Sequence, residues 1–338
     1  MKHVIGPAHV YLGMHIAFKE SGTVEIWMGD QIKEAIEMFG EDVSLNAVTP
    51  AKRDLFEVDP ESPALTVEKG EIFHSVTCKL LYVAKRCRLD VQLPISFLAT
   101  RVSKSTIQDW DKLKRVLRFL NGTLDEVLVL ASQNILKMDV FVDASYGVHD
   151  DMKGHTGGCV TFGRGAVMSK STKQKLNTKS STETEIVGCS DYMTQPLWGK
   201  KFIEAQGYKL DCDAHQDNKS AMQMEINGRK SCGPKSRHID IRYFWFHDRI
   251  KKGEFNIVHC PTHKMIADFF TKPLQGDLFK KLRAVIMGHV DLKTFMSQES
   301  DTSKERVGEN EVEGSERANE MPMTKTESAC ETRANDTS

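Results

Sequence analysis

The order of strands and helices predicted for residues 137–290 limits the possible folds of this 338-residue chain more than any other feature. Alternating apolar residues and Gly-rich turns predict three successive strands, with Gly163–Gly165 as the hairpin connection between the second and third. The first predicted strand ends at Asp143, and strands at 157–163 and 166–170 follow it. A helix is then predicted from Ser180–Thr182 towards Gly207, and Pro196 should kink or interrupt it. After this helix come a strand leading into Asp217, helices at 218–227 and 238–250, a strand at 254–260 and a helix containing Asp268. This order predicts an α/β fold with a mixed five-stranded sheet and flanking helices.

Four carboxylates in this segment lie at or near the edges of predicted elements. They are Asp143, Glu185, Asp217 and Asp268. Several carboxylates that converge on one point can hold two divalent ions roughly 3.5–4 Å apart, and such a pair clamps the attacking and leaving oxygens of a phosphodiester. Mg²⁺ prefers oxygen ligands, so no histidine or cysteine cage is required. If the four carboxylates converge, the chain is predicted to cut nucleic acid.

Each of these carboxylates also has a purely structural interpretation. Asp143 could end a strand before a turn, and Asp217 could be the N-cap of the helix that follows it. Glu185 lies three residues after Thr182, which is the spacing of a capping box. Asp268 could be an exposed helix position. The colinear set of four favours the functional interpretation over any single member.

The net charge of −1 conceals a segregation of charge along the chain. Residues 137–290 contain 24 Lys and Arg against 17 Asp and Glu, whereas residues 291–338 contain 6 against 12. A basic segment that also holds an acidic cluster suits a polyanionic substrate. The candidate nucleic-acid contacts are Lys170, Lys173, Lys175, Lys179, Asn218 and Ser220. A solvated loop is the alternative explanation for the lysines.

The remaining composition indicates the class of protein and its surroundings. The eight cysteines have no regular spacing, which predicts free thiols in an intracellular protein, in the cytoplasm or the nucleus. The apolar runs are far shorter than the roughly 20 residues of a membrane span, so no membrane contact is expected. Segment 291–338 is acidic and poor in apolar residues, and it is predicted to be disordered. The oligomeric state is not indicated.

Several motifs resemble those of one family. The sequences VDAS, SSTETE, QDNKSA, KSRHIDIRYFWF and VHCPTHKMIADFFTKPL are similar, in this order, to the RNase H domain of copia-type retrotransposon Pol polyproteins. Upstream, YLGMHIAF, NAVTP, KLLYVAKRC and WDKLKRVLRFLNGT resemble the reverse transcriptase thumb and connection of the same polyproteins. The resemblance covers about residues 1–288. It implies a partial, mostly helical thumb/connection region over 1–136, an RNase H-like domain over 137–290 and a tail over 291–338.

The resemblance also implies a reaction and its site. Asp143, Glu185, Asp217 and Asp268 would be the ligands of two Mg²⁺ ions, for which Mn²⁺ could substitute. The reaction would be hydrolysis of the RNA strand of an RNA–DNA hybrid, recognised by duplex shape and 2′-hydroxyls. Because no YxDD polymerase motif precedes Tyr11, the chain is expected not to polymerise DNA alone, and upstream Pol segments could be supplied separately.

Two further interpretations of the motifs remain open. His263 could be a loop histidine that assists product release, or an exposed turn residue, and His238 with Asp240 favours a helix start over a metal pair. The whole chain could instead be an inactive retroelement remnant that acts at most as a nucleic-acid-binding or interaction module. The order Asp, Glu, Asp, Asp argues against a polynucleotidyl transferase of the integrase type, which needs Asp, Asp, Glu.

Overall fold

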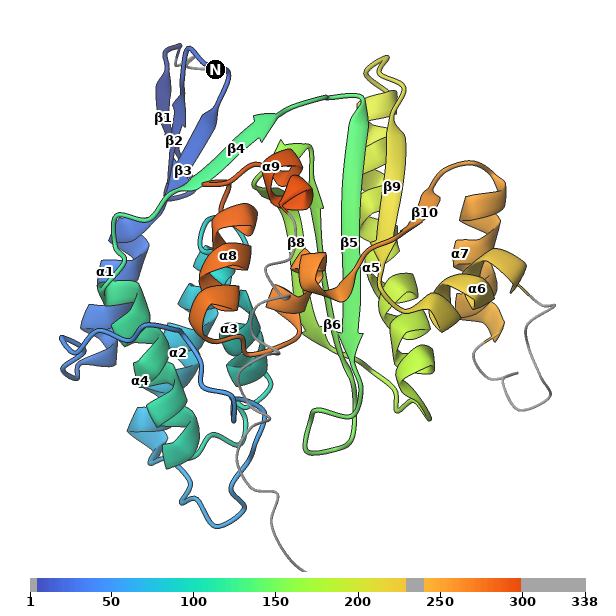
Figure 1. The fold of residues 1–338 in the computed structure, drawn as a ribbon. Helices are drawn as coiled ribbons and strands as arrows, with labels where there is room; N and C mark the ends of the chain where they lie inside the picture. Colours follow the sequence, from blue (N-terminus) through green and yellow to red (C-terminus); the bar gives the residue numbers. More distant parts are fainter. Residues whose placement is uncertain (1–4, 229–239, 299–338) are drawn as a thin grey trace, which may run out of the picture. The chain divides into compact units, whose positions relative to one another are not determined.

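The fold is built around a mixed sheet of five strands (Figure 1). The computed structural model describes residues 5–228 and 240–298. The sheet has the order β10-β9-β5-β6-β8, formed by β5 (Lys137–Ser145), β6 (His155–Thr161), β8 (Ala166–Lys173), β9 (Asp211–Gln216) and β10 (Asn256–His259). Strands β5, β6 and β8 are antiparallel, while β9 and β10 run parallel to β5. This is the RNase H-like fold, and it confirms the predicted order of elements as far as β10.

Both faces of the central strand β5 are covered, because alternate side chains of a strand point to opposite faces. Val140 and Val142 belong to one apolar cluster, together with Tyr192 and Met193 of helix α5 (Ser181–Glu204). Phe141 belongs to a second cluster on the other face. Figure 1 shows α5 behind the sheet and the segment with 3-10 helix η5 (Ile266–Phe270) in front of it. Burial on both faces explains the uninterrupted apolar run of Val140, Phe141 and Val142 in the middle of β5.

Some element boundaries differ from the sequence predictions. Strand β5 runs on past Asp143 to Ser145, because the ladder with β6 continues to the pair Ser145 and His155. The third strand likewise extends beyond Lys170 to Lys173. The Gly163–Gly165 connection is more than a hairpin turn: its first two residues form β7 (Gly163–Arg164), which pairs with β4 (Leu128–Ser132). Because β4 and β7 are far apart in the sequence, no local sequence pattern predicts that they pair.

Helix α5 is continuous through Pro196, so the predicted interruption is wrong. A proline inside a helix removes one backbone hydrogen bond and costs about 3 kcal/mol or more. Tyr192, Met193 and Leu197 around it are buried in the apolar cluster that also contains Val140 and Val142. Burial of such side chains contributes roughly 1.5–3 kcal/mol each, which is enough to offset the proline.

The first 136 residues combine helices with a second, antiparallel sheet. The helices are α1 (Gly29–Phe39), α2 (Val67–Ala84), η1 (Leu89–Val91), α3 (Gln92–Ala99) and α4 (Ile107–Asn121). The sheet joins β1 (Ala8–Tyr11), β2 (Met14–Phe18) and β3 (Val24–Trp27) to β4 and β7. Helix α4 carries an apolar stripe on one face, since Trp110, Leu113, Leu117 and Leu120 are all buried.

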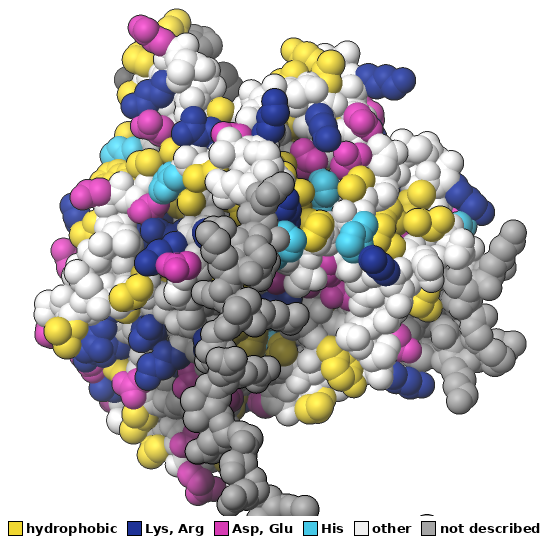
Figure 2. Space-filling model, in the orientation of Figure 1, with side chains coloured by type: hydrophobic (Ala, Val, Ile, Leu, Met, Phe, Trp, Pro, Cys, Tyr) yellow, Lys and Arg dark blue, Asp and Glu magenta, His cyan; other side chains and the backbone are white. Residues whose placement is uncertain are grey.

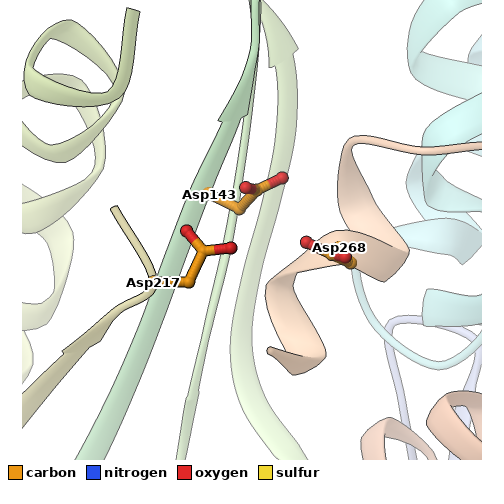
Figure 3. Close-up of side chains that lie close together, drawn as sticks. All are labelled: Asp143, Asp217 and Asp268. Carbon is orange, nitrogen blue, oxygen red and sulfur yellow. The ribbon is translucent and has the colours of Figure 1, made fainter. Parts of the chain in front are cut away.

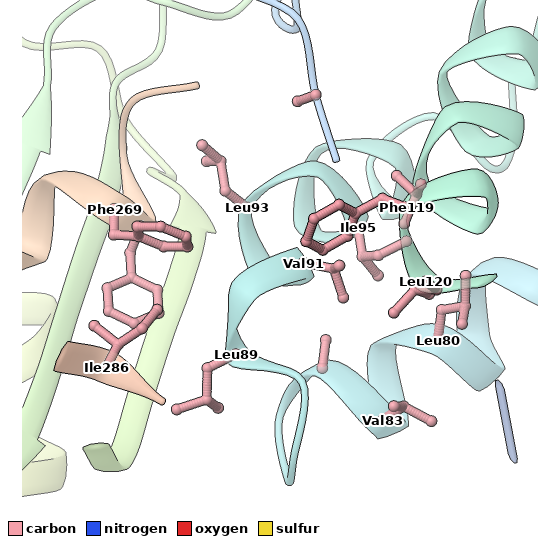
Figure 4. Packing of buried hydrophobic residues seen from close by; sticks show 14 of the residues in the cluster. Leu80, Val83, Leu89, Val91, Leu93, Ile95, Phe119, Leu120, Phe269 and Ile286 are labelled. Carbon is pink, nitrogen blue, oxygen red and sulfur yellow. The ribbon is translucent and has the colours of Figure 1, made fainter. Parts of the chain in front are cut away.

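One apolar core joins the helices of the first 136 residues to the front of the mixed sheet. Figure 4 shows Leu89 and Leu93 near Phe269 of η5 and Ile286 of α8 (Gly276–Ile286). Buried Asp90 reinforces this junction, since it accepts hydrogen bonds from Arg88 at 2.9 Å and from Arg283 of α8 at 2.8 Å. The described residues up to Gln298 accordingly form one compact unit. The predicted division into two domains at residue 137 stays a prediction.

The predicted disordered tail begins too early. A short helix, α9 (Leu292–Ser297), follows α8 and buries Leu292 and Phe295, and Asp291 caps it by accepting from the Thr294 amide at 2.8 Å. Two apolar side chains at helical spacing are enough to dock this segment. Residues 299–338 lie outside the described part of the chain.

Two compositional predictions can be compared with the described residues. The cysteines among them are all free: Cys78, Cys87, Cys159, Cys189, Cys212 and Cys260. None of the helices in 5–228 and 240–298 combines the length and the apolar character needed to cross a membrane.

Candidate metal centre

Three aspartates converge at one edge of the mixed sheet. Ligand oxygens of Asp143, Asp217 and Asp268 all lie within 4.8 Å of one another. Figure 3 shows the three carboxylates pointing toward one another from β5, from the residue after β9 and from η5. The sequence prediction of convergence is thus met for these three residues.

The parallel pairing of β5 and β9 explains why Asp143 and Asp217 meet. The ladder pairs Phe141 with His215, so that each aspartate lies two residues further along the chain, Asp143 within β5 and Asp217 directly after β9. Because parallel strands run in the same direction, both side chains leave the same face at the same edge.

Packing brings Asp268 to this edge. Its neighbours Ile266, Phe269 and Phe270 are buried in the shared apolar core and hold η5 against the sheet. Asp268 is only 6% exposed, so the interpretation as an exposed helix position is wrong. It lies in a 3-10 helix rather than in the predicted final α-helix.

Glu185 lies near the aspartates without joining the tight cluster. It is buried in the second turn of α5, and its Oε2 atom has no hydrogen-bond partner. Burial, followed by the charges of Asp143 and Asp217, raises the pKa of Glu185 well above its ordinary value. A buried carboxylate oxygen without a partner is costly, and a cation beside it would remove that cost.

The capping alternatives fail for both Glu185 and Asp217. Ser180, not Thr182, is the N-cap of α5, and its hydroxyl accepts from the Glu183 amide at 3.2 Å. Asn218, not Asp217, is the N-cap of helix α6 (Lys219–Asn227) and accepts from the Ala221 amide at 3.1 Å. Both carboxylates are therefore free of a capping role.

The electrostatics of the cluster are those of crowded buried acids. Burial raises the pKa of Asp143, against the opposing effect of Lys272 and of a hydrogen bond from the Thr271 hydroxyl. Burial and the neighbouring charge of Asp143 raise the pKa of Asp268. Like charges this close cannot all ionise without a counter-ion. The donor set contains only carboxylate oxygens, and it fits a hard divalent cation such as Mg²⁺.

Lys272 is a member of the site that the sequence analysis missed. Its ammonium nitrogen lies 2.8 Å from Asp268 Oδ1 and 3.8 Å from Asp143 Oδ2. The available signal was its position four residues after Asp268 within TKPL, which is the spacing of a helical ion pair.

The predicted nucleic-acid contacts fall into two groups. Lys170 donates to the Asp191 carbonyl at 3.0 Å and Lys173 pairs with Asp151 at 2.8 Å, so both have partners within the chain. The exposed residues of the set are Lys175, Lys179 and Ser220. Asn218 is half-buried and uses its side-chain oxygen for the cap of α6.

The predicted histidine features are only partly described. His263 is exposed in 3-10 helix η4 (Thr262–Lys264), as the simpler interpretation predicted. Its neighbour Thr262 donates to Asp217 Oδ2 at 3.3 Å. His238 lies outside the described residues, as does the side chain of Asp240, although that residue begins helix α7 (Asp240–Lys251).

Comparisons with known proteins agree with the resemblance. No protein-family model matches the chain. A Pol polyprotein from transposon TNT 1-94 of Nicotiana tabacum is 25% identical over 293 residues, which is 84% of this chain and 22% of that protein. The polyprotein from transposon RE2 of Arabidopsis thaliana is 28% identical over 228 residues, covering 65% of this chain and 16% of that protein. The putative transposon Ty5-1 protein of Saccharomyces cerevisiae is 28% identical over 192 residues, covering 55% of this chain and 61% of that protein.

Two solved structures also align with parts of the chain. LC11-RNase H1 in complex with an RNA/DNA hybrid is 11% identical, with a TM-score of 0.30, covering 39% of this chain and 92% of that one. A foamy viral protease-reverse transcriptase in complex with dsDNA is 13% identical, with a TM-score of 0.41, covering 77% of this chain and 46% of that one.

The sheet order and the position of the carboxylates define an RNase H-like fold with a cluster of three aspartates at one edge of its sheet. The chain is a homologue of copia-type retrotransposon Pol polyproteins over most of its length. It spans about a fifth or less of the length of the polyproteins from TNT 1-94, RE2 and RE1.

Proposed function

We propose that this chain is a metal-dependent ribonuclease that hydrolyses the RNA strand of RNA–DNA hybrids. The observation that carries the proposal is the convergence of Asp143, Asp217 and Asp268 within 4.8 Å at one sheet edge. Homology to Pol polyproteins supports this choice of substrate over other phosphodiesters. As a portion of such a polyprotein it would act without polymerase activity of its own, inside the cell, in the cytoplasm or the nucleus.

In this proposal the four acidic residues hold two Mg²⁺ ions, for which Mn²⁺ can substitute. When bound, the ions would supply a water activated for attack and would neutralise charge on the departing 3′ oxygen. The β5–β9 ladder and the core beneath η5 hold the aspartates in place before substrate binds. Glu185 would add a ligand from α5, because its partnerless oxygen lies in the field of Asp143 and Asp217.

The chain's own polar residues would position the duplex. Two neighbouring residues would first orient the carboxylates: the Thr271 hydroxyl donates to Asp143, and the Lys272 ammonium donates to Asp268. Lys175, Lys179 and Ser220 are exposed and could contact phosphates, whereas Lys170 and Lys173 would first have to release their partners. Recognition would depend on duplex shape and 2′-hydroxyls, as is general for helical RNA.

A second candidate function is a nucleic-acid-binding module without cleavage. The observation that favours it is the ammonium of Lys272, which lies 2.8 Å from Asp268 and already supplies a counter-ion inside the cluster. In an inactive remnant this lysine would take the place of the metal as the neutralising charge.

Cleavage of a labelled RNA–DNA hybrid in Mg²⁺ or Mn²⁺ tests the two candidates. The wild-type chain is compared with Asp143→Asn and with Asp125→Asn, a matched control at an exposed position. Cleavage by the wild type and the control, with a loss of about 100-fold or more in Asp143→Asn, is the expected result. No cleavage by a folded wild type in either metal would overturn the nuclease proposal and favour the binding module.

A further inference from the structure

A cationic cavity lies away from the carboxylates, between α4 and the segment 45–55. It has a volume of about 480 Å³. Its cationic lining residues are Lys52, Lys112, Lys114, Arg115 and Arg118, and its acidic ones are Asp54 and Asp111. Figure 2 shows Lys and Arg side chains gathered over α4. Cavities of roughly 300–1,000 Å³ are the size that holds a nucleotide or a similar ligand.

Both lysines of α4 that line the cavity have partners within the chain. Lys114 pairs with Glu41 at 2.8 Å. Lys112 donates to the carbonyl of Glu57 and lies over the ring of Phe97. These contacts hold the two lysines in the wall of the cavity, so Lys52, Arg115 and Arg118 supply most of the positive charge that a ligand would meet.

The arginines retain unused donors. The buried Nε atoms of Arg115 and Arg118 have no hydrogen-bond partner, although Arg115 also donates to the Thr49 hydroxyl at 3.1 Å. A buried donor without a partner costs about 1–3 kcal/mol, and more when it is charged. An acceptor that enters the cavity would remove this cost for both residues.

The arrangement of the arginines selects the kind of acceptor. They lie three residues apart on α4, so their side chains share one face of the helix. Burial lowers the pKa of Arg115, as does the charge of Arg118, while Asp54 opposes both effects. A planar guanidinium pairs through two parallel bonds with the oxygens of phosphate, and two such groups suit an anion with several acceptor oxygens.

We propose that this cavity binds a phosphate group, carried either by a nucleic acid strand or by a free nucleotide. The path to the carboxylates favours the strand. Pro50 and Ala51 line the cationic cavity and also a small second cavity, whose wall includes Lys272. These shared residues place the cationic cavity beside a cavity that borders Lys272 of the carboxylate cluster. The proposal does not depend on nuclease activity, because binding needs no metal.

Binding measured in EDTA tests the proposal and separates the two sources of phosphate. The full chain is titrated against a labelled RNA–DNA hybrid by fluorescence anisotropy and against AMP and inorganic phosphate by calorimetry. We expect Arg115→Gln/Arg118→Gln to weaken hybrid binding about tenfold and to reduce the salt dependence by about one phosphate contact or more. Lys33→Gln/Lys281→Gln removes the same charge from exposed positions and should change affinity less than about twofold.

The outcomes distinguish the alternatives. Loss of hybrid binding alone identifies a strand phosphate, and loss of AMP or phosphate binding as well identifies a free nucleotide as a second source. The proposal would be overturned if the arginine double variant and the lysine double variant bound each of the three probes with equal affinity. It would also be overturned if the wild-type chain bound none of the probes. If the double variant fails to fold, Arg118→Gln alone decides, because it keeps the bond between Arg115 and Thr49.

Discussion

The ammonium of Lys272 lies 2.8 Å from the carboxylate of Asp268 and 3.8 Å from that of Asp143. A cation built into the chain thus occupies the neighbourhood in which a divalent ion would have to bind. The lysine stabilises the crowded acids when no metal is present, and it would have to yield when a metal binds. This competition leads to the first prediction.

Lys272→Met should lower stability without metal and increase the stabilisation that Mg²⁺ provides. The side chain is 40% exposed, so solvent screening limits the loss to about 1 kcal/mol. Without the ammonium, the acids gain more from a divalent ion, and the shift in melting temperature on adding Mg²⁺ should grow. Thermal unfolding without metal and with millimolar Mg²⁺ measures both the loss of stability and the Mg²⁺-induced shift in melting temperature. Lys281→Met serves as the exposed control, and an unchanged Mg²⁺ shift in Lys272→Met would contradict the prediction.

A buried histidine pair should make stability depend on pH. His149 Nε2 lies 3.0 Å from His155 Nδ1, and His155 in turn contacts the Ser171 hydroxyl at 2.7 Å. Burial lowers the pKa of His149 to about 4, from an ordinary value of 6.5. Because the unfolded chain binds the proton more readily, the stabilising effect of the neutral ring is complete above pH 6.5 and is lost as the pH falls towards 4.

The difference between wild type and His149→Gln isolates this effect from the carboxylates. Urea unfolding at several pH values between these limits should show the wild type losing up to about 3 kcal/mol relative to the variant. His289→Gln, at a more exposed position, is the control. A constant difference between wild type and His149→Gln across the range would show that protonation of His149 does not control stability.

Phe269→Ala should damage the acidic centre through packing rather than through charge. Phe269 is 4% exposed and its ring centroid lies 5.3 Å from that of Phe279. Its loss should cost about 3–5 kcal/mol, since it leaves a cavity beneath η5. The backbone of Asp268 should then shift, and the Mg²⁺-induced rise in melting temperature should shrink. Phe202→Ala, at a position that is 56% exposed, should leave both quantities nearly unchanged.

A normal Mg²⁺ response in a strongly destabilised Phe269→Ala would separate η5 packing from the metal centre. Calorimetry or circular dichroism at a temperature where the variant remains folded makes this comparison possible.

The amino-acid sequence alone determined the element order and the candidate ligands. Local apolar periodicity predicted the strands around Val140 and Ile257 and the helix that begins after Ser180, because such periodicity reflects which face of each element is buried. The motifs singled out Asp143, Glu185, Asp217 and Asp268, of which the three aspartates meet in the structure.

Contacts between segments far apart in the chain decided the rest. The β5–β9 register brings Asp143 to Asp217, and the shared core carries Asp268 and Lys272 to the same edge. The pairing of β7 with β4, the docking of α9 and the cationic cavity beside α4 likewise depend on partners that no local pattern specifies. Periodicity reports that a face will be buried, but only the packed structure selects which surface buries it and which charges are left facing one another.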